Sequence, residues 1–155
     1  MKLRLLAVGQ KMPLWVTQGV QEYAKRLPAD CCLDIVEIAP GHRAKNTPVE
    51  KAMQQEAEAL RKAIRPSDHV VALAVDGKPW STPQLAQQLG QWRMQGGDVA
   101  LLVGGPDGMT DDILSLAKQR WSLSNLTLPH PLVRVLLAEQ LYRAWSILQG
   151  HPYHK

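Results

Sequence analysis

Short apolar runs recur along the chain, and four of them predict β-strands. The first, KLRLLAV at 2–8, ends at Gly9, and the second, Leu33–Ile38, alternates roughly between apolar and polar residues. The runs at His69–Val75 and Asp98–Val103 are nearly continuously apolar, as in strands that are covered on both faces. A fifth, shorter strand is expected at Leu126–Leu128.

Helical spacing of apolar residues fills the intervals between these runs. Between Pro13 and Leu27 the apolar positions recur with the period of one helix face. A second helix is expected from Thr47 to about Ile64, with Thr47 and Glu50 forming a capping box at its start. The remaining helices are expected from Thr82 to about Gln95, from Thr110 to Arg120 and over Leu132–Leu148.

Strands and helices therefore alternate along the whole chain. This order is typical of an α/β fold with a mostly parallel sheet flanked by helices. A length of 155 residues predicts a single domain over 1–155. Asp76-Gly77 is expected to turn the chain after the third strand, and the basic, turn-rich loop Pro40–Asn46 is expected to be exposed and mobile.

Composition is that of an ordinary globular protein, with 45% hydrophobic and 21% charged residues. The longest unbroken apolar run, Val70–Val75, is far too short to span a membrane, so no membrane association is expected. Cys31 and Cys32 are adjacent and cannot form a disulfide framework. Together with the lack of a signal peptide, this predicts a cytoplasmic location.

The net charge of +4 is concentrated at the C-terminal end. Residues 1–112 carry 13 basic and 13 acidic side chains, whereas residues 113–155 carry five basic and one acidic. A basic end on a neutral body is consistent with a solvated basic surface and also with a polyanionic partner.

Glycines follow the two most apolar predicted strands, at Asp76-Gly77 and at Gly104–Gly108. In a parallel sheet, ligands bind at the carboxyl ends of the strands, so these glycines predict either a cofactor cradle or a tight turn. The chain contains no P-loop, no G-x-G-x-x-G after the first strand, no G-x-S-x-G and no H-E-x-x-H. The pair His151 and His154 lacks a third ligand, so no metal site is expected.

The last helix carries charged residues of two kinds. Glu139, Arg143 and Ser146 form a polar stripe, and the first two have the spacing of a surface ion pair. Arg134 lies instead on the apolar side, where its guanidinium needs a carboxylate, a cluster of carbonyl groups or a bound phosphate, in a structural pair or as an anion contact. Because this helix is so apolar, association between subunits is also expected.

Three further side chains are candidates for chemistry near the C-terminus. His130 stands between two prolines before the last helix, where it can orient a substrate, transfer a proton or simply begin the helix. Tyr153 and His154 can contact a nucleobase or belong to a disordered end. The tryptophans Trp15, Trp92 and Trp145 are expected in the core.

Four segments in order carry a family resemblance: LVGGPDG at 102–108, WSLSNLTLPH at 121–130, VRVLLAEQLYRAW at 133–145 and HPYHK at 151–155. They closely resemble the RlmH (YbeA-like) ribosomal RNA methyltransferases of the SPOUT, or α/β-knot, superfamily. The resemblance covers essentially the whole chain. It implies a homodimer with a C-terminal trefoil knot, which hydrophobic patterning alone cannot predict because knots are so rare.

The resemblance also implies an activity and a set of site residues. Family members transfer a methyl group from S-adenosylmethionine to N3 of a pseudouridine in a large-subunit ribosomal RNA hairpin, on the assembled ribosome. Carried over by motif, the cofactor-binding residues are Leu73, Gly104, Gly105, Leu123, Ser124, Asn125, Leu126, Thr127 and Leu128.

The residues proposed to act on the RNA complete this hypothesis. N3 carries a proton that must leave, so the site needs a proton acceptor or stabilisation of the deprotonated base. We expect six side chains to surround the flipped base and nearby phosphates, with the tail completing a neighbouring subunit's site: His130, Arg134, Tyr142, Arg143, Tyr153 and His154. A non-catalytic ribosome-binding protein and an α/β enzyme for a free metabolite are the alternatives.

Overall fold

The computed structural model describes residues 1–155 and contains one five-stranded sheet. The strands lie in the order β2-β1-β4-β3-β5, and every neighbouring pair is parallel. All five carboxyl ends therefore lie at the same edge of the sheet, and the expected parallel α/β architecture is confirmed. The bounds are β1 (Lys2–Val8), β2 (Cys32–Ile38), β3 (His69–Pro79), β4 (Val99–Val103) and β5 (Gln119–Ser122).

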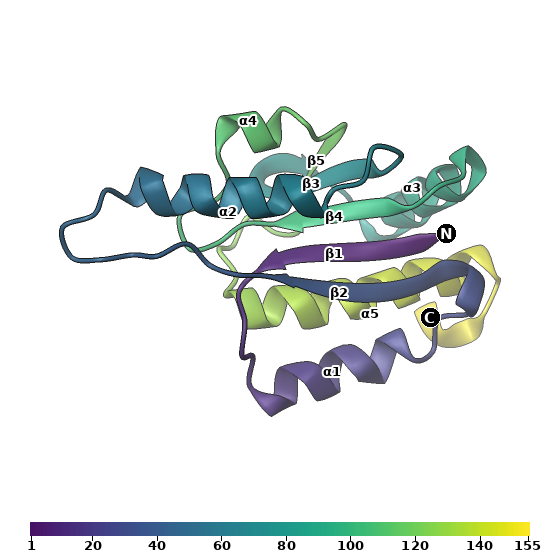
Figure 1. The fold of residues 1–155 in the computed structure, drawn as a ribbon. Coiled ribbons are helices and arrows are strands. Elements are labelled where there is room, and N and C mark those ends of the chain that lie inside the picture. Colours follow the sequence, from purple (N-terminus) through teal and green to yellow (C-terminus); the bar gives the residue numbers. More distant parts are fainter.

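Helices cover both faces of this sheet (Figure 1). Helices α1 (Leu14–Ala24), α3 (Thr82–Gln95) and α5 (His130–Leu148) share the larger core with one face. Helices α2 (Val49–Ala63) and α4 (Asp111–Leu114) share a smaller core with the other. Two 3₁₀ turns, η1 (Ala29–Cys31) and η2 (Pro152–His154), precede β2 and end the chain.

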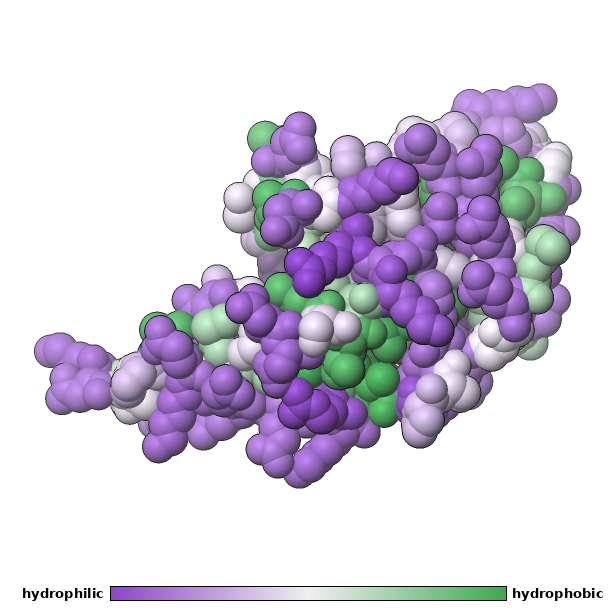
Figure 2. Space-filling model, turned by 90° about the horizontal axis from the view of Figure 1, so that it is seen from above, coloured by the Kyte–Doolittle hydropathy of each residue, from purple (hydrophilic) through white to green (hydrophobic).

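Strand β1 contributes to both cores through the alternation of its side chains. Leu3, Leu5 and Ala7 belong to the core beneath α1, α3 and α5, whereas Leu6 and Val8 belong to the core beneath α2 and α4. On the α2 and α4 side, hydrophilic side chains surround a patch of hydrophobic surface (Figure 2). The two helices on this side therefore leave part of the apolar surface uncovered.

The fifth strand differs from the sequence prediction. The helix expected from Thr110 to Arg120 ends at Leu114, and the chain then forms β5 at the sheet edge instead of at Leu126–Leu128. Pairing with β3 explains the difference, because it buries Trp121 to 3% exposure against a strand more than 40 residues earlier in the chain. A local pattern of apolar residues cannot predict a pairing between segments that lie so far apart in the sequence.

Asp76-Gly77 does not turn the chain, because β3 continues to Pro79. The register with β5 shifts between Leu73 and Lys78, and both of these residues pair with Trp121. The intervening residues therefore form a bulge. Gly77 is required there, since a Cβ at this position would lie 2.8 Å from the backbone of Arg120 and Trp121.

The start of the second helix also differs from expectation. Helix α2 begins after Pro48 without a side-chain cap, so the predicted Thr47–Glu50 capping box is absent. A complete capping box forms instead at α3, between Ser81 and Gln84.

The tryptophans divide between the core and the surface. Trp92 is buried, as predicted, and Trp145 is partly buried against the larger core. Trp15 is 51% exposed on α1, so its assignment to the core was wrong. The trefoil knot and the single-domain organisation stay predictions.

Candidate cofactor pocket and the two ends of helix α5

A cavity of about 770 Å³ opens where the strands end and α5 begins. Its wall includes Gly9 after β1, the bulge of β3, the Gly104–Gly108 turn after β4 and the 122–130 segment that leads into α5. Half of the residues that line it are hydrophobic, and the only charged side chain is that of Asp76. A largely apolar cleft at the carboxyl ends of parallel strands is a favourable site for a small ligand.

Eight of the nine residues predicted to bind a cofactor line this cavity. Asn125 is the exception, and its side chain is exposed. Leu126 is 72% exposed even though it contributes to the wall. The eight lining residues are Leu73, Gly104, Gly105, Leu123, Ser124, Leu126, Thr127 and Leu128.

The Gly104–Gly108 turn is tightly packed against the protein itself. A Cβ on Gly104 would lie 2.8 Å from Cγ of Met109, and one on Gly105 would lie 2.9 Å from Oε1 of Glu56. Gly108 has a φ of +81° and its amide donates to the carbonyl of Gly105 at 3.0 Å. The two sequence interpretations therefore apply together, since these residues form both a tight turn and part of the cavity wall.

His130 lines the cavity at the first residue of α5. Its Nε2 forms a hydrogen bond with the carbonyl oxygen of Gly104, and its Nδ1 is buried without a partner. A carbonyl only accepts, so Nε2 carries the proton and, in the neutral ring, Nδ1 keeps its lone pair. The structure thus leaves one imidazole nitrogen able to accept a hydrogen bond or a proton.

Arg134 lies one turn further along α5 and is 3% exposed. Its Nη1 donates to the carboxylate of Glu37 at 2.8 Å, and its Nη2 donates to the carbonyl of Gly9 at 2.9 Å. The buried guanidinium therefore has a carboxylate and a carbonyl as partners, although the Glu37 side chain itself is 41% exposed. Arg134 does not line the cavity itself, but it fixes Gly9, which does.

The C-terminal end of α5 carries a cluster of aromatic rings and guanidinium groups. The tail folds back so that the Tyr153 and Tyr142 rings lie 4.6 Å apart, which makes this part of the chain ordered. The Cζ atom of Arg143 lies 4.9 Å from the ring centroid of Tyr153. Arg26 follows the end of α1, and its Cζ atom lies 5.3–5.7 Å from the ring centroids of Tyr23, Tyr142 and Tyr153.

Each of these guanidinium groups has a glutamate partner. The predicted Glu139–Arg143 pair is confirmed at 2.6 Å, and Glu22 accepts from Arg26 at 2.6 Å. These hydrogen bonds raise the pKa of both arginines, whereas burial raises the pKa of Tyr153. Both arginines are therefore charged and Tyr153 is neutral near pH 7. Ser146, expected on the same polar stripe, is buried and donates to the carbonyl of Arg143 at 2.7 Å.

Within one chain, the six residues predicted to act on RNA fall into two groups. His130 lines the cavity and Arg134 lies beside it at the start of α5, whereas Tyr142, Arg143, Tyr153 and His154 lie towards the other end of α5 or in the tail. Figure 1 shows the two ends of this helix. The helical rise places His130 and Tyr142 about 18 Å apart along the axis. A single chain does not bring them together.

Several residues of these sites escaped the sequence predictions. Tyr23 and Arg26 join the tail cluster, and the only local sign was the favourable spacing of Glu22 and Arg26. Arg43 and Glu56 contact the glycine turn across 49 or more residues, which no local pattern reveals.

Other classes of site are not evident. No cluster of three or more His, Cys, Asp or Glu side chains is arranged to hold a metal ion. None of the helices combines the length and the apolar character needed to cross a membrane.

Comparison with known proteins gives one consistent family. Residues 1–154 match the family model described as "Predicted SPOUT methyltransferase". Proteins named "Ribosomal RNA large subunit methyltransferase H" from Chromohalobacter salexigens and Hahella chejuensis are 63% and 61% identical over 155 residues. The alignments cover all of this chain and 100% and 99% of those proteins.

A solved structure supports the fold independently. The structure of a probable methylase family protein from Haemophilus influenzae Rd KW20 superposes with a TM-score of 0.59 and 13% identity. It covers 99% of this chain and 70% of that one. At this identity the likeness concerns the fold alone, whereas the family model and the relatives span the full chain. The chain therefore belongs to the SPOUT methyltransferase family.

Proposed function

We propose that the protein uses S-adenosylmethionine to methylate large-subunit ribosomal RNA, at N3 of a pseudouridine and on the assembled ribosome. The names of relatives at 61% and 63% identity over the full chain support the RNA substrate. The family resemblance of the four sequence segments supports the acceptor atom and the assembled particle. The single observation that carries the proposal is the apolar cavity between the glycine turn and the start of α5.

The residues along this cavity fit S-adenosylmethionine. Apolar side chains such as Leu73, Leu123 and Leu128 suit an adenine ring, while the backbone of Gly104 and Gly105 and of the 123–128 segment offers polar groups. His130 contributes a buried nitrogen without a partner. When bound, the cofactor supplies an electrophilic methyl group on a sulfonium, so the protein mainly has to hold the methyl and the acceptor in line.

Two side chains, His130 and Arg143, are suited to act on the base that accepts the methyl group. The N3 proton has to leave, and Nδ1 of His130 keeps a lone pair that can accept it directly or through water. Arg143 is fully charged and can stabilise negative charge on the base or contact a phosphate. The aromatic rings beside it offer stacking surfaces for an unpaired base.

A homodimer is part of the proposal. One chain keeps the cavity and the tail cluster at opposite ends of α5, so a second chain is needed to bring the tail of one to the cavity of the other. Exposed apolar side chains on α1 and α5 support such an association: Leu14, Trp15, Leu132 and Leu136. The cytoplasmic location belongs to the same proposal, because assembled ribosomes are the substrate.

Transfer of labelled methyl from S-adenosylmethionine tests this function. Unmodified ribosomes and free ribosomal RNA are compared as acceptors, and the labelled nucleoside is identified after digestion. We expect label in N3-methylpseudouridine from ribosomes only. Label in another nucleoside would contradict the acceptor, and the absence of cofactor binding by calorimetry would favour a non-catalytic ribosome-binding protein.

A further inference from the structure

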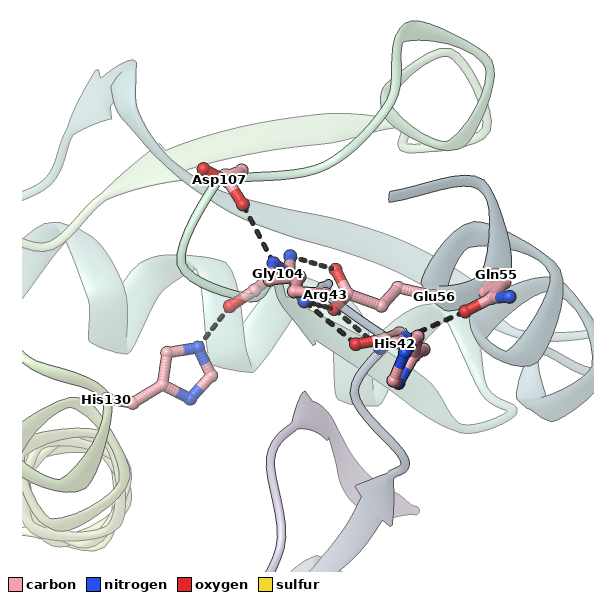
Figure 3. A network of polar contacts seen from close by, with 8 residues as sticks. His42, Arg43, Gln55, Glu56, Gly104, Asp107 and His130 are labelled. Atoms are coloured by element: carbon pink, nitrogen blue, oxygen red, sulfur yellow. Dashed lines mark hydrogen bonds and ion pairs between the residues drawn. The ribbon is translucent and has the colours of Figure 1, made fainter. Parts of the chain in front are cut away.

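Arg43 is held in place although it belongs to the basic Pro40–Asn46 loop. Its Nη1 and Nη2 donate to the carboxylate of Glu56 at 2.7 and 3.3 Å, and its Nε donates to Asp107 at 3.0 Å (Figure 3). Nη1 also contacts the carbonyl of Gly41 at 3.2 Å. A side chain with this many charge-assisted contacts is fixed, whereas the sequence predicted an exposed and mobile loop here.

Glu56 lies on α2 and is 2% exposed. Besides Arg43, it accepts from the backbone amide of Gly41 at 2.9 Å. A buried carboxylate of this kind is stable only when its charge is matched and its oxygens are hydrogen-bonded. Glu56 therefore fastens both the side chain and the backbone of the loop to α2, while the hydrogen bond to Glu56 raises the pKa of Arg43 and keeps it charged.

The same two residues reach the glycine turn of the cavity. Asp107 belongs to this turn, and Gly105 passes so close to Glu56 that a Cβ would lie 2.9 Å from the carboxylate. The turn is thereby held from two sides. Gly104 precedes these contacts, and its carbonyl is the group that His130 meets across the cavity wall (Figure 3).

We propose that Arg43 and Glu56 are positioning residues for the methyl-donor pocket. Arg43 joins the loop, α2 and the Gly104–Gly108 turn, so that the turn keeps the shape that lines the cavity and presents its carbonyl to His130. This inference rests on the proposed use of S-adenosylmethionine at the cavity. Neither residue acts on the reacting atoms.

Arginine is needed at position 43 because two acceptors lie on different edges of its guanidinium. Nε serves Asp107 while Nη1 and Nη2 serve Glu56. A lysine ammonium is a single point charge and cannot reproduce this fork. Arg43→Lys thus keeps the charge beside Glu56 but releases the turn.

The experiment compares Arg43→Lys, Arg43→Met and Asp107→Asn with wild type. A matched control is Arg61→Met, which removes another arginine contact between α2 and the chain after β4, the one to Asp112, away from the cavity. Three quantities are measured: the Kd for S-adenosylmethionine by calorimetry, the melting temperature, and the imidazole ¹⁵N shifts of His130 without cofactor.

We expect both Arg43 variants to weaken cofactor binding by about tenfold and Asp107→Asn by about threefold, while Arg61→Met binds like wild type. The His130 shifts should move in the first three variants only. The Asp107 side chain is 37% exposed, whereas Glu56 would lose the partner of a buried charge, so Asp107→Asn is expected to fold even if Arg43→Met does not.

Two results would overturn the positioning role. One is wild-type affinity with unmoved His130 shifts in Arg43→Lys and Asp107→Asn, and the other is an equal loss in Arg61→Met. Failure of wild type itself to bind S-adenosylmethionine would instead contradict the proposed function. In that event the His130 shifts still decide whether Arg43 positions the turn.

Discussion

The two ends of α5 present opposite kinds of surface to a ligand. At its start, the cavity wall consists of apolar side chains and of backbone from the glycine turn, with His130 as the one imidazole. At its other end, Arg26 and Arg143 lie on tyrosine rings, and each keeps a glutamate partner. The first end depends on backbone shape and the second on side-chain charge and stacking. Substitutions at the two ends should therefore impair different properties of the protein, cofactor binding at the first end and methyl transfer at the second.

The largest effect is expected from Gly105→Ala at the cavity end. The added methyl group would lie 2.9 Å from the Glu56 carboxylate, so the turn has to move. We expect a loss of about 1–3 kcal/mol in the free energy of unfolding, together with loss of cofactor binding. Chemical denaturation and calorimetry measure the two.

Gly90→Ala on α3 is the control for this substitution. Its Cβ would meet only Leu148 at 3.6 Å, an ordinary contact, so stability should be unchanged or rise by up to about 1 kcal/mol. Normal cofactor affinity in Gly105→Ala would show that the shape of the turn does not matter to the pocket.

A smaller and more selective effect is expected from Arg143→Ala at the tail end. Removing this guanidinium should lower methyl transfer by about a hundredfold and leave the Kd for S-adenosylmethionine unchanged, because Arg143 is proposed to contact the RNA and not the cofactor. Single-turnover transfer and calorimetry separate the two quantities.

Arg120→Ala is the matched control, since Arg120 is an exposed arginine of the same basic segment outside the cluster. We expect it to change transfer by less than about threefold. An equal loss in both variants would mean that net charge, and not the aromatic cluster, determines activity.

The smallest effect concerns the ionisation of Tyr153. Burial raises its pKa above the ordinary value of 10.0, and the nearby guanidinium groups oppose that shift only in part. The neutral phenol therefore contributes stability that is complete below pH 10 and is lost as the pH rises through the folded-state pKa.

Phenolate absorbance during alkaline titration measures this pKa when Tyr153→Phe is subtracted from wild type. Circular dichroism over the same pH range is the control for unfolding. A midpoint at or below that of free tyrosine would mean that the tail does not pack on α5 as described.

The sequence was sufficient for elements whose apolar pattern is local. Strand β1 has the predicted bounds, β2, β3 and β4 lie where predicted, and α5 begins two residues before the predicted Leu132. Strand β5 was missed because Gln119 and Arg120 give it no apolar run, and only pairing with β3 makes it a strand.

The candidate site divides in the same way. The cofactor segment was predictable because its residues follow one another along the chain, and the resemblance supplied their role. The Arg43–Glu56–Asp107 contacts were not, since each joins residues 13 or more positions apart. The separation of His130 from Tyr142 is set by the length of one helix and follows from their spacing in the sequence.

The most direct test of the account is whether two chains share one site. Gly105→Ala, with a defective cavity, and Arg143→Ala, with a defective tail cluster, are co-expressed, and methyl transfer to ribosomes is compared with each variant alone. If the tail of one subunit serves the cavity of the other, half of the dimers are mixed and each has one intact site, so about a quarter of wild-type activity should return. Activity that stays at the level of the single variants would contradict a site built from both subunits.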